Sequence, residues 1–238
     1  TSQGATVTIA GINFASINAT ATAELGDSST ICATTSWTTS LTVKCESSGG
    51  SGSAQSIKVL VGGLTGTALK IFSFDAPVVS FYLTPNSPST AHSTTTITGL
   101  NFASVVVTST VRIGSSVCLT VSWSSATALH CTTPPGGGKS ASVYISVSSL
   151  VGTAAMAYSY DSPAVTSVLP YNGRNGVLSG GTSVTVHGLN FATHNSSPTV
   201  HLHASCKTTS WTSSTSLACQ PSHATSSIMA TTVTIMGS

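Results

Sequence analysis

One pattern of cysteine and tryptophan occurs three times along the chain, and it constrains the fold more than any other feature. In each copy two cysteines stand 13 positions apart and a tryptophan follows the first cysteine by five, which gives C-x4-W-x7-C. The first cysteines of successive copies lie 86 and 88 residues apart. The copies are Cys32, Trp37 and Cys45; Cys118, Trp123 and Cys131; and Cys206, Trp211 and Cys219. A fixed period of this length predicts tandem repeats of one small domain.

A second landmark, Gly-x-Asn-Phe-Ala, recurs in step with the cysteines. It begins at Gly11, Gly99 and Gly188, and each copy follows a segment in which apolar and hydroxyl residues alternate, such as Ser183-Val184-Thr185-Val186. Alternation with period two indicates half-buried strands. Several such strands in each repeat, separated by Gly, Pro and Asn turns, predict an antiparallel β-sandwich.

The order of these landmarks resembles the IPT/TIG family of immunoglobulin-like domains. Repeat two matches most fully, through Trp123-Ser124-Ser125, Cys131-Thr132-Thr133-Pro134-Pro135-Gly136 and Tyr158-Ser159-Tyr160-Asp161-Ser162-Pro163. The resemblance implies an all-β chain of tandem immunoglobulin-like repeats at residues 1–77, 78–163 and 164–238. It implies little about function, because this fold serves many functions. Members of the family occur in cell-surface receptors, in Rel-type transcription factors and beside sugar-processing enzymes.

The triplicated spacing predicts three disulfides within repeats, Cys32–Cys45, Cys118–Cys131 and Cys206–Cys219. Each would close a short loop and stabilise its repeat by roughly 3 kcal/mol. Zinc is the alternative, although the close C-x2-C pairs of structural zinc sites are missing. Three disulfides predict an oxidising, extracellular location, either secreted or at a cell surface.

The tryptophans Trp37, Trp123 and Trp211 allow two interpretations. Their identical offset in each repeat favours core residues packed near the disulfide. The alternative is a row of platforms on which sugars stack.

Two N-glycosylation sequons, at Asn18 and Asn195, occupy the same loop of repeats one and three. Ser and Thr together make up 83 of 238 residues, a composition that also permits O-linked sugars, while charged residues are only 5%. Attached glycans would supply the hydration that charged side chains usually provide. We therefore expect a glycoprotein.

The same low charge argues against several partners. A net charge of +2 is too small for a surface that follows nucleic-acid phosphates. No apolar run approaches the ~18 residues of a membrane span.

Residues for catalysis are also scarce, and the sequence predicts neither an enzyme nor a cofactor. Acid–base chemistry needs paired carboxylates or a histidine oriented by an acid. The chain has five acids, and Asp75 and Asp161 are repeat equivalents beside a proline, which suits a junction between repeats. Weaker alternatives are a calcium site at Glu24 and Asp27 and a metal site at His201 and His203, with His187 or His194.

Aligning the repeats suggests that repeat one lacks its first strand and repeat three its last. Open strand edges favour association, and head-to-tail contacts that do not close give filaments. We therefore expect a structural subunit of an extracellular fibril or surface coat that binds copies of itself head to tail. The alternative is an ectodomain array for adhesion, receptor or carbohydrate binding, which would need exposed aromatics such as Tyr171 or Tyr82.

Overall fold

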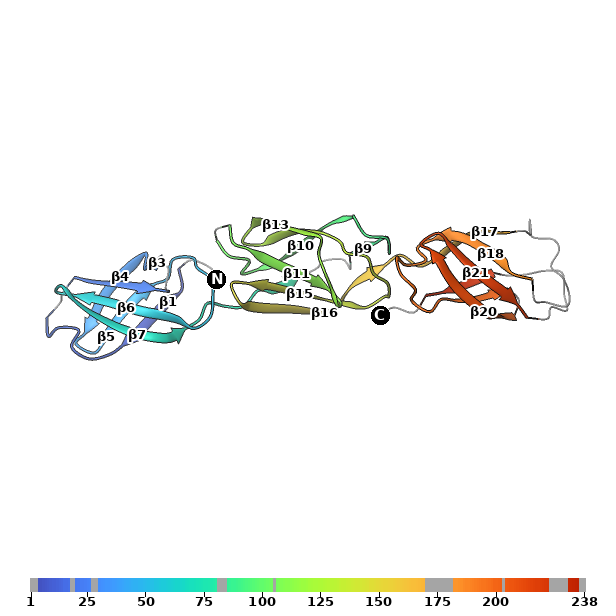
Figure 1. Ribbon diagram of the computed structural model, residues 1–238. Coiled ribbons are helices and arrows are strands. Elements are labelled where there is room, and N and C mark those ends of the chain that lie inside the picture. Colours follow the sequence, from blue (N-terminus) through green and yellow to red (C-terminus); the bar gives the residue numbers. More distant parts are fainter. Residues whose placement is uncertain are drawn as a thin grey trace.

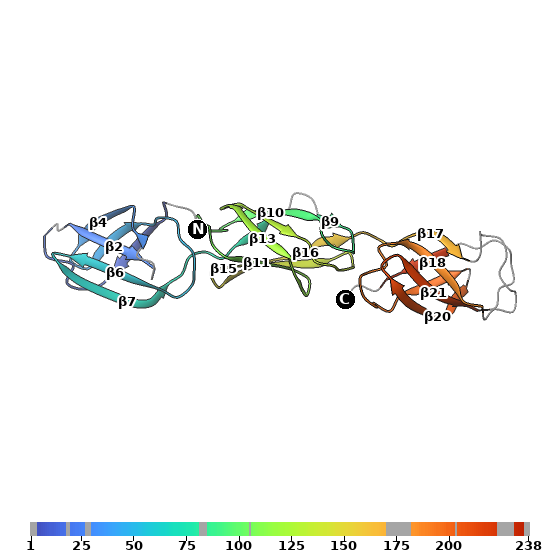
Figure 2. The ribbon, with the colours of Figure 1, turned by 45° about the horizontal axis from the view of Figure 1, so that its top comes forward.

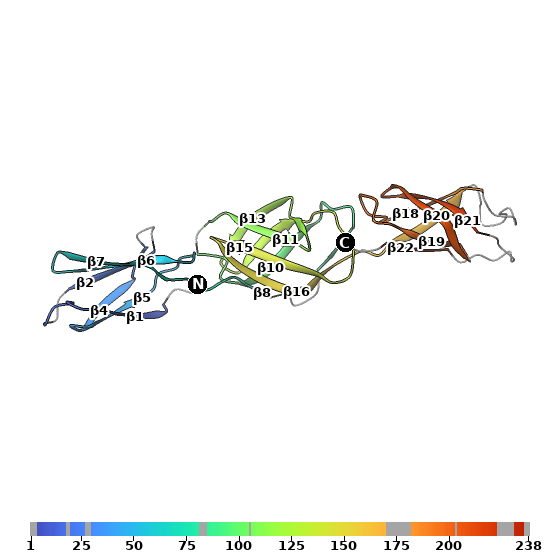
Figure 3. The same cartoon turned by 60° about the horizontal axis from the view of Figure 1, so that its bottom comes forward.

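In the computed structural model the chain forms three β-sandwiches that follow one another in a row (Figure 1). The structure describes residues 4–17, 20–26, 30–80, 85–104, 106–169, 182–202, 204–222 and 231–235, and these contain strands and turns but no helix. Accordingly, no helix able to cross a membrane is found in these ranges. The row is also seen when the molecule is turned (Figure 2, Figure 3). The expected all-β fold of tandem antiparallel sandwiches is confirmed.

The first repeat packs a sheet of order β1-β5-β4 against a sheet of order β3-β2-β6-β7. Its strands are β1 (Thr6–Ala10), β2 (Ala21–Leu25), β3 (Thr30–Ile31), β4 (Thr34–Thr39), β5 (Thr42–Glu46), β6 (Gln55–Val61) and β7 (Leu64–Phe72).

The second repeat has the same two layers with an additional strand in each. Its sheets have the orders β13-β14-β10-β8 and β12-β11-β15-β16-β9. The strands are β8 (Val78–Ser80), β9 (Asn86–Ser87), β10 (Thr94–Leu100), β11 (Ser109–Ile113), β12 (Ser116–Val117), β13 (Thr120–Ser125), β14 (Ala128–Thr132), β15 (Ala141–Val147) and β16 (Leu150–Tyr160).

The third repeat forms one hydrogen-bonded series, β17-β18-β21-β20-β19-β22. Strand β20 takes part in both layers, because its start pairs with β19 and the rest with β21. The strands are β17 (Ala164–Leu169), β18 (Val184–Leu189), β19 (Thr199–Leu202), β20 (Ala204–Ser213), β21 (Ser216–Pro221) and β22 (Thr231–Thr234).

Each sandwich encloses its own apolar core, as the alternating sequence pattern predicts. In repeat two the fully buried side chains include Val111, Leu129, Val143 and Ile145. The cores of repeats one and three are built from equivalent strands. One face of each sheet is therefore apolar, and the other carries many Thr and Ser side chains together with exposed apolar ones such as Leu60 and Val151.

The repeats differ at their sheet edges. In the described residues β1 pairs only with β5, whereas its equivalents β10 and β18 have strands on both sides, β10 between β14 and β8 and β18 between β21 and β17. Within the same described ranges β22 pairs with β19 alone, whereas β15 lies between β11 and β16.

Candidate functional site

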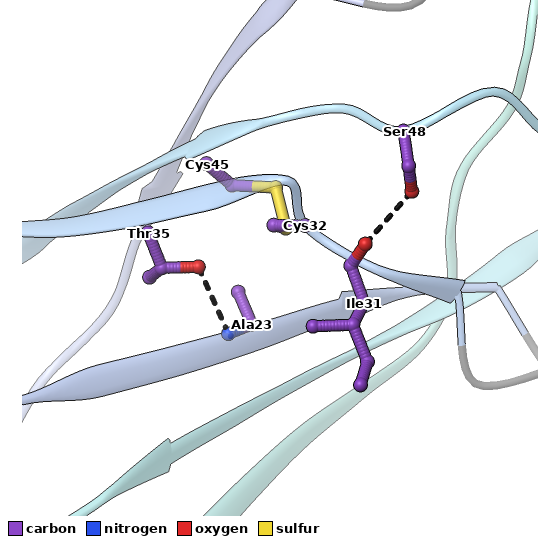
Figure 4. The surroundings of a disulfide bond; sticks show 6 residues. All are labelled: Ala23, Ile31, Cys32, Thr35, Cys45 and Ser48. Atoms are coloured by element: carbon purple, nitrogen blue, oxygen red, sulfur yellow. Dashed lines mark hydrogen bonds between the residues drawn. A yellow bond between two sulfur atoms is a disulfide. The ribbon is translucent and has the colours of Figure 1, made fainter.

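All six cysteines form disulfides within their own repeats, as predicted. The Cα atoms of the pairs are 5.6 to 5.8 Å apart, within the usual range. Around the first disulfide, the Ala23 amide donates to Thr35 Oγ1 at 3.2 Å and Ser48 Oγ donates to the Ile31 carbonyl at 2.7 Å (Figure 4). No cysteine is left to bind zinc, so the zinc alternative is excluded.

The three tryptophans make the same hydrogen bond in every repeat. The indole Nε1 donates to the carbonyl of the motif phenylalanine, at 2.6 Å from Trp37 and 2.8 Å from Trp123 and Trp211. All three side chains are half-buried. Each tryptophan therefore holds the Gly-x-Asn-Phe-Ala loop against its own sandwich.

The motif loop has an unusual backbone that explains its residues. The asparagine and alanine have positive φ in every copy, for example 65° at Asn101 and 67° at Ala103. Asparagine tolerates this left-handed conformation better than most residues. The glycine leaves room for the phenylalanine ring, because a Cβ at Gly99 would lie 2.6 Å from Phe102 Cζ.

The motif asparagine joins neighbouring repeats. Asn101 Nδ2 donates to the Ala76 carbonyl at 3.1 Å, and Asn190 Nδ2 donates to the Ser162 carbonyl at 3.3 Å. Both acceptors lie in the segments that link one repeat to the next. The asparagine therefore fixes the linker that enters its repeat, a role that its sequence position alone does not show.

The first linker is also held by the repeat that it leaves. The Phe74 amide donates to the Gly52 carbonyl at 3.0 Å, so only Asp75 separates this bond from the Ala76 carbonyl bound by the next repeat. The two repeats meet directly as well, because Ser51 Oγ and Ser148 Oγ are 2.8 Å apart.

The second linker is held as tightly. The Asp161 amide donates to the Ser87 carbonyl at 2.8 Å, and the Asp161 carboxylate accepts a short hydrogen bond from Asn86 Nδ2. The very next residue, Ser162, is bound by repeat three. Neither linker therefore has a free segment of more than one residue.

The outer face of one sheet in repeat two carries an exposed aromatic side chain. Tyr144 in β15 lies in register with Arg112 in β11 and with Thr153 in β16. It is 38% exposed, the one aromatic among the large exposed apolar side chains of the described residues. Tyr144 was not among the candidate residues, although the alternation Val143-Tyr144-Ile145 already places it opposite two core residues.

The equivalent face of repeat one has a charged pair in a shallow groove of about 320 Å³. Glu24 Oε2 lies 3.7 Å from Lys58 Nζ. Such a solvent-exposed pair adds little stability. The groove is lined by Thr22, Glu24, Lys58, Leu60, Thr65 and Thr67.

Two buried tyrosines lie where the second linker leaves repeat two. Burial raises the pKa of Tyr158, and burial together with the neighbouring Tyr158 raises the pKa of Tyr160 to about 12. The rings pack edge to face with centroids 5.3 Å apart. Both phenols therefore stay neutral at physiological pH and serve as packing groups.

Of the predicted glycosylation sites, Asn195 is exposed in a loop, and its Oδ1 accepts a hydrogen bond from the Ser197 amide at 3.1 Å. Asn18 lies outside the described residues, as do Tyr82 and Tyr171.

The described residues bring no further ligands to the two metal-site alternatives. His201 Nδ1 lies 3.1 Å from Ser205 Oγ, while His203 and Asp27 lie outside the described residues. The described part of the chain contains no group of three or more His, Cys, Asp or Glu that could hold a metal ion.

A model of the IPT/TIG domain family matches the chain twice in tandem, at residues 77–160 and 163–238. The chain belongs to the IPT/TIG family. Repeat one lies outside both matches but has the same disulfide, tryptophan bond and motif loop. No curated protein matches the chain.

Several solved structures are similar to this IPT/TIG chain. The full extracellular region of plexin A4, domains 1 to 10, is 18% identical with a TM-score of 0.35, over 93% of this chain and 20% of that one. The surface glycan-binding protein PbSGBP-B from Prevotella bryantii is 14% identical with a TM-score of 0.46, over 68% of this chain and 40% of that one. A Bacteroides ovatus SGBP-B in complex with a mixed-linkage heptasaccharide is 15% identical with a TM-score of 0.30, over 93% of this chain and 55% of that one.

This chain thus spans between one fifth and just over half of the length of these three proteins. All three likenesses are below 25% identity and below a TM-score of 0.5, so none carries an argument about function.

Proposed function

We propose that this chain is part of the extracellular region of a recognition or adhesion protein, in which the IPT/TIG repeats form a stiff spacer. The observation that carries the proposal is the pair of short linkers. Each is held by hydrogen bonds from the repeat it leaves and from the motif asparagine of the repeat it enters. Three disulfides support an oxidising location outside the cytoplasm.

The proposed role is not catalytic. Two of the carboxylates form structural contacts, Glu24 beside Lys58 and Asp161 beside Asn86. Neither contact includes the oriented histidine or paired carboxylate that acid–base catalysis requires.

Small-angle X-ray scattering of the purified 238-residue chain tests the stiffness. The parent chain should give the profile of one extended rod, and a double variant Asn101→Ala with Asn190→Ala should give a broader range of shapes. Trp37→Phe is the matched control, since it removes the tryptophan hydrogen bond within repeat one, whose motif loop makes neither of the two asparagine bonds to the linkers. The proposal is wrong if the parent already scatters as flexibly joined domains.

A second candidate is carbohydrate recognition at the Tyr144 face. A tyrosine ring offers an apolar surface for a sugar, while Arg112 and Thr153 beside it offer polar groups. Titration with soluble plant and microbial oligosaccharides, followed by tyrosine fluorescence, should show binding that Tyr144→Ala abolishes. A chain that binds none of these oligosaccharides leaves adhesion to a protein partner as the proposal.

The fibril or surface-coat subunit assembled head to tail stays a prediction, as do the N-glycans and O-glycans. Negative-stain electron microscopy of native material tests the fibril, since regular filaments would support it and isolated rods at every concentration would contradict it.

A further inference from the structure

Repeats two and three each receive an extended linker strand on the same surface. In repeat two, Asn101 binds the Ala76 carbonyl, and β8 pairs with β10. A Cβ at Gly99 would overlap the Val78 carbonyl, and a Cβ at Gly152 would overlap the Pro77 carbonyl. Repeat three repeats this arrangement with Asn190, Gly188 and β17.

Repeat one keeps the residues of this surface but has no strand on it in the described part of the chain. Asn13 has the same left-handed backbone as its equivalents, with φ of 65°, and its side chain is exposed. Gly66 stands in β7 where Gly152 stands in β16, yet a Cβ there would meet only the Val59 carbonyl oxygen, at 4.0 Å. Nothing within the described repeat therefore requires a glycine at position 66, and glycine inside a strand lowers stability.

Burial of the motif shows what the strand does where it is present. Phe102 and Phe191 are completely buried, whereas Phe14 is only half-buried. In repeats two and three the entering strand adds Val79 and Val165 to the core cluster, and among the described residues of repeat one no side chain takes that place. The core of repeat one is thus open where its siblings are closed.

Apolar side chains border this opening. Ile12 is 75% exposed, compared with 56% for Leu100, which faces Val78 of the linker strand. Leu64 of β7, two residues before Gly66, is 80% exposed. An open strand edge beside apolar side chains suits the addition of a strand, in which main-chain hydrogen bonds give affinity and side-chain pockets give selectivity.

We propose that this surface, which we call the acceptor edge (β1, Gly11–Ala15 and Gly66), is a docking site for one extended strand with the Asp-x-Pro-x-Val pattern of the linkers in this chain. The Pro carbonyl would lie over Gly66, the carbonyl of the residue before it would accept from Asn13, and the valine two positions after the proline would cover Phe14. In a folded second copy both linkers are already paired, with β10 and β18, so the strand comes from another IPT/TIG repeat.

A fusion tests the docking. In the fusion, a copy of residues 73–88 is placed directly in front of Thr1. Gly11 and Gly99 are 88 residues apart, so the copy lies as far before Gly11 as the natural segment lies before Gly99. Amide hydrogen exchange over β1 should slow at least tenfold in the fusion, since β1 gains a hydrogen-bonded neighbour.

The matched control is Gly66→Val. Its side chain has open space in the parent chain, so Gly66→Val alone should leave β1 exchange at the parent rate and should not lower the Tm of repeat one. In the fusion it should occupy the place of the proline carbonyl and return β1 exchange to the parent rate. Equal exchange in parent and fusion would overturn the proposal, and so would a fusion that Gly66→Val does not affect.

A free peptide separates the possible occupants. The peptide of residues 73–88 added to the parent chain should bind once per chain, and more weakly to Gly66→Val by at least tenfold. The opposite result is a parent chain that self-associates in a way that Gly66→Val abolishes, and that fails to bind the peptide. That result would make a second copy of the chain the occupant and would refute the linker strand.

Discussion

The pair of equivalent glycines, Gly152 and Gly66, allows one contact between linker and repeat to be measured. A Cβ at Gly152 would lie 2.7 Å from the Pro77 carbonyl carbon and 3.1 Å from Pro77 Cβ, whereas a Cβ at Gly66 would lie 4.0 Å from its nearest neighbour. Carbon atoms normally approach to about 3.4 Å or more. In Gly152→Ala the linker must therefore move by at least about 0.7 Å, and further to clear the Pro77 carbonyl oxygen, which the Cβ would overlap, whereas in Gly66→Ala nothing has to move.

The magnitude follows from this difference. Forcing an additional methyl group into a packed site costs about 1–3 kcal/mol. Restricting the unfolded chain by Gly→Ala stabilises both variants by about 0.4–1 kcal/mol, so this contribution cancels when the two are compared. Relative to the parent chain, the free energy of unfolding should therefore change less favourably in Gly152→Ala than in Gly66→Ala, by about 1–3 kcal/mol. One kcal/mol changes the Tm of a domain of this size by roughly 4–8 °C.

Differential scanning calorimetry of both variants and the parent chain measures the effect. Gly152→Ala changes the Tm of repeat two, and Gly66→Ala changes the Tm of repeat one. The first change should be more negative than the second by at least about 4 °C. The reasoning is refuted if the two variants shift their transitions equally, because the Pro77 contact would then not determine the packing at Gly152.

Three further predictions concern single features. Replacing Cys118 and Cys131 together by Ser should lower the free energy of unfolding of repeat two by roughly 3 kcal/mol, measured by guanidinium denaturation, and an unchanged midpoint would contradict the loop-closure argument. The pKa of Tyr160 is raised to about 12 in the folded state, so the folded state holds the phenol proton more tightly than the unfolded chain. The contribution of Tyr160 to the free energy of unfolding should therefore be constant below about pH 10 and fall by roughly 1.4 kcal/mol by pH 11. Tyr160→Phe should flatten this fall in alkaline urea titrations, and an equal slope in parent and variant would argue against the assignment. Expressed through a eukaryotic secretory pathway, the chain should lose one N-glycan mass in Asn195→Gln, and an intact mass unchanged by this substitution would show that Asn195 is unmodified.

The repeat pattern was sufficient to predict the disulfides and the sandwich. Cys118 lies just before β13 and Cys131 lies on β14, and a short turn joins these two strands, so their spacing alone constrains which partner each can reach. Alternation of apolar and hydroxyl residues likewise determines which side of each strand faces the core.

The junctions could not be predicted in the same way. Asn101 repeats at the same place as Asn13 and Asn190, but its acceptor is a backbone carbonyl 25 residues earlier, and a carbonyl leaves no mark in the sequence. The sequence shows that Gly66 and Gly152 are equivalent, because the same residue recurs at the same place in both repeats. Why a glycine is needed there is seen only in the structure, where the Pro77 carbonyl lies over Gly152.

The parallel pairing of β9 with β16 has a mechanical consequence. Asn86 and Ser87 lie near the beginning of repeat two, while Ser159 and Tyr160, with which they pair, lie at its end. If the two ends of the repeat are pulled apart, these neighbouring strands are drawn in opposite directions along their length. The bonds between them then bear the load together in shear rather than opening one after another, so this repeat should resist stretching up to a threshold force and then yield in a single step.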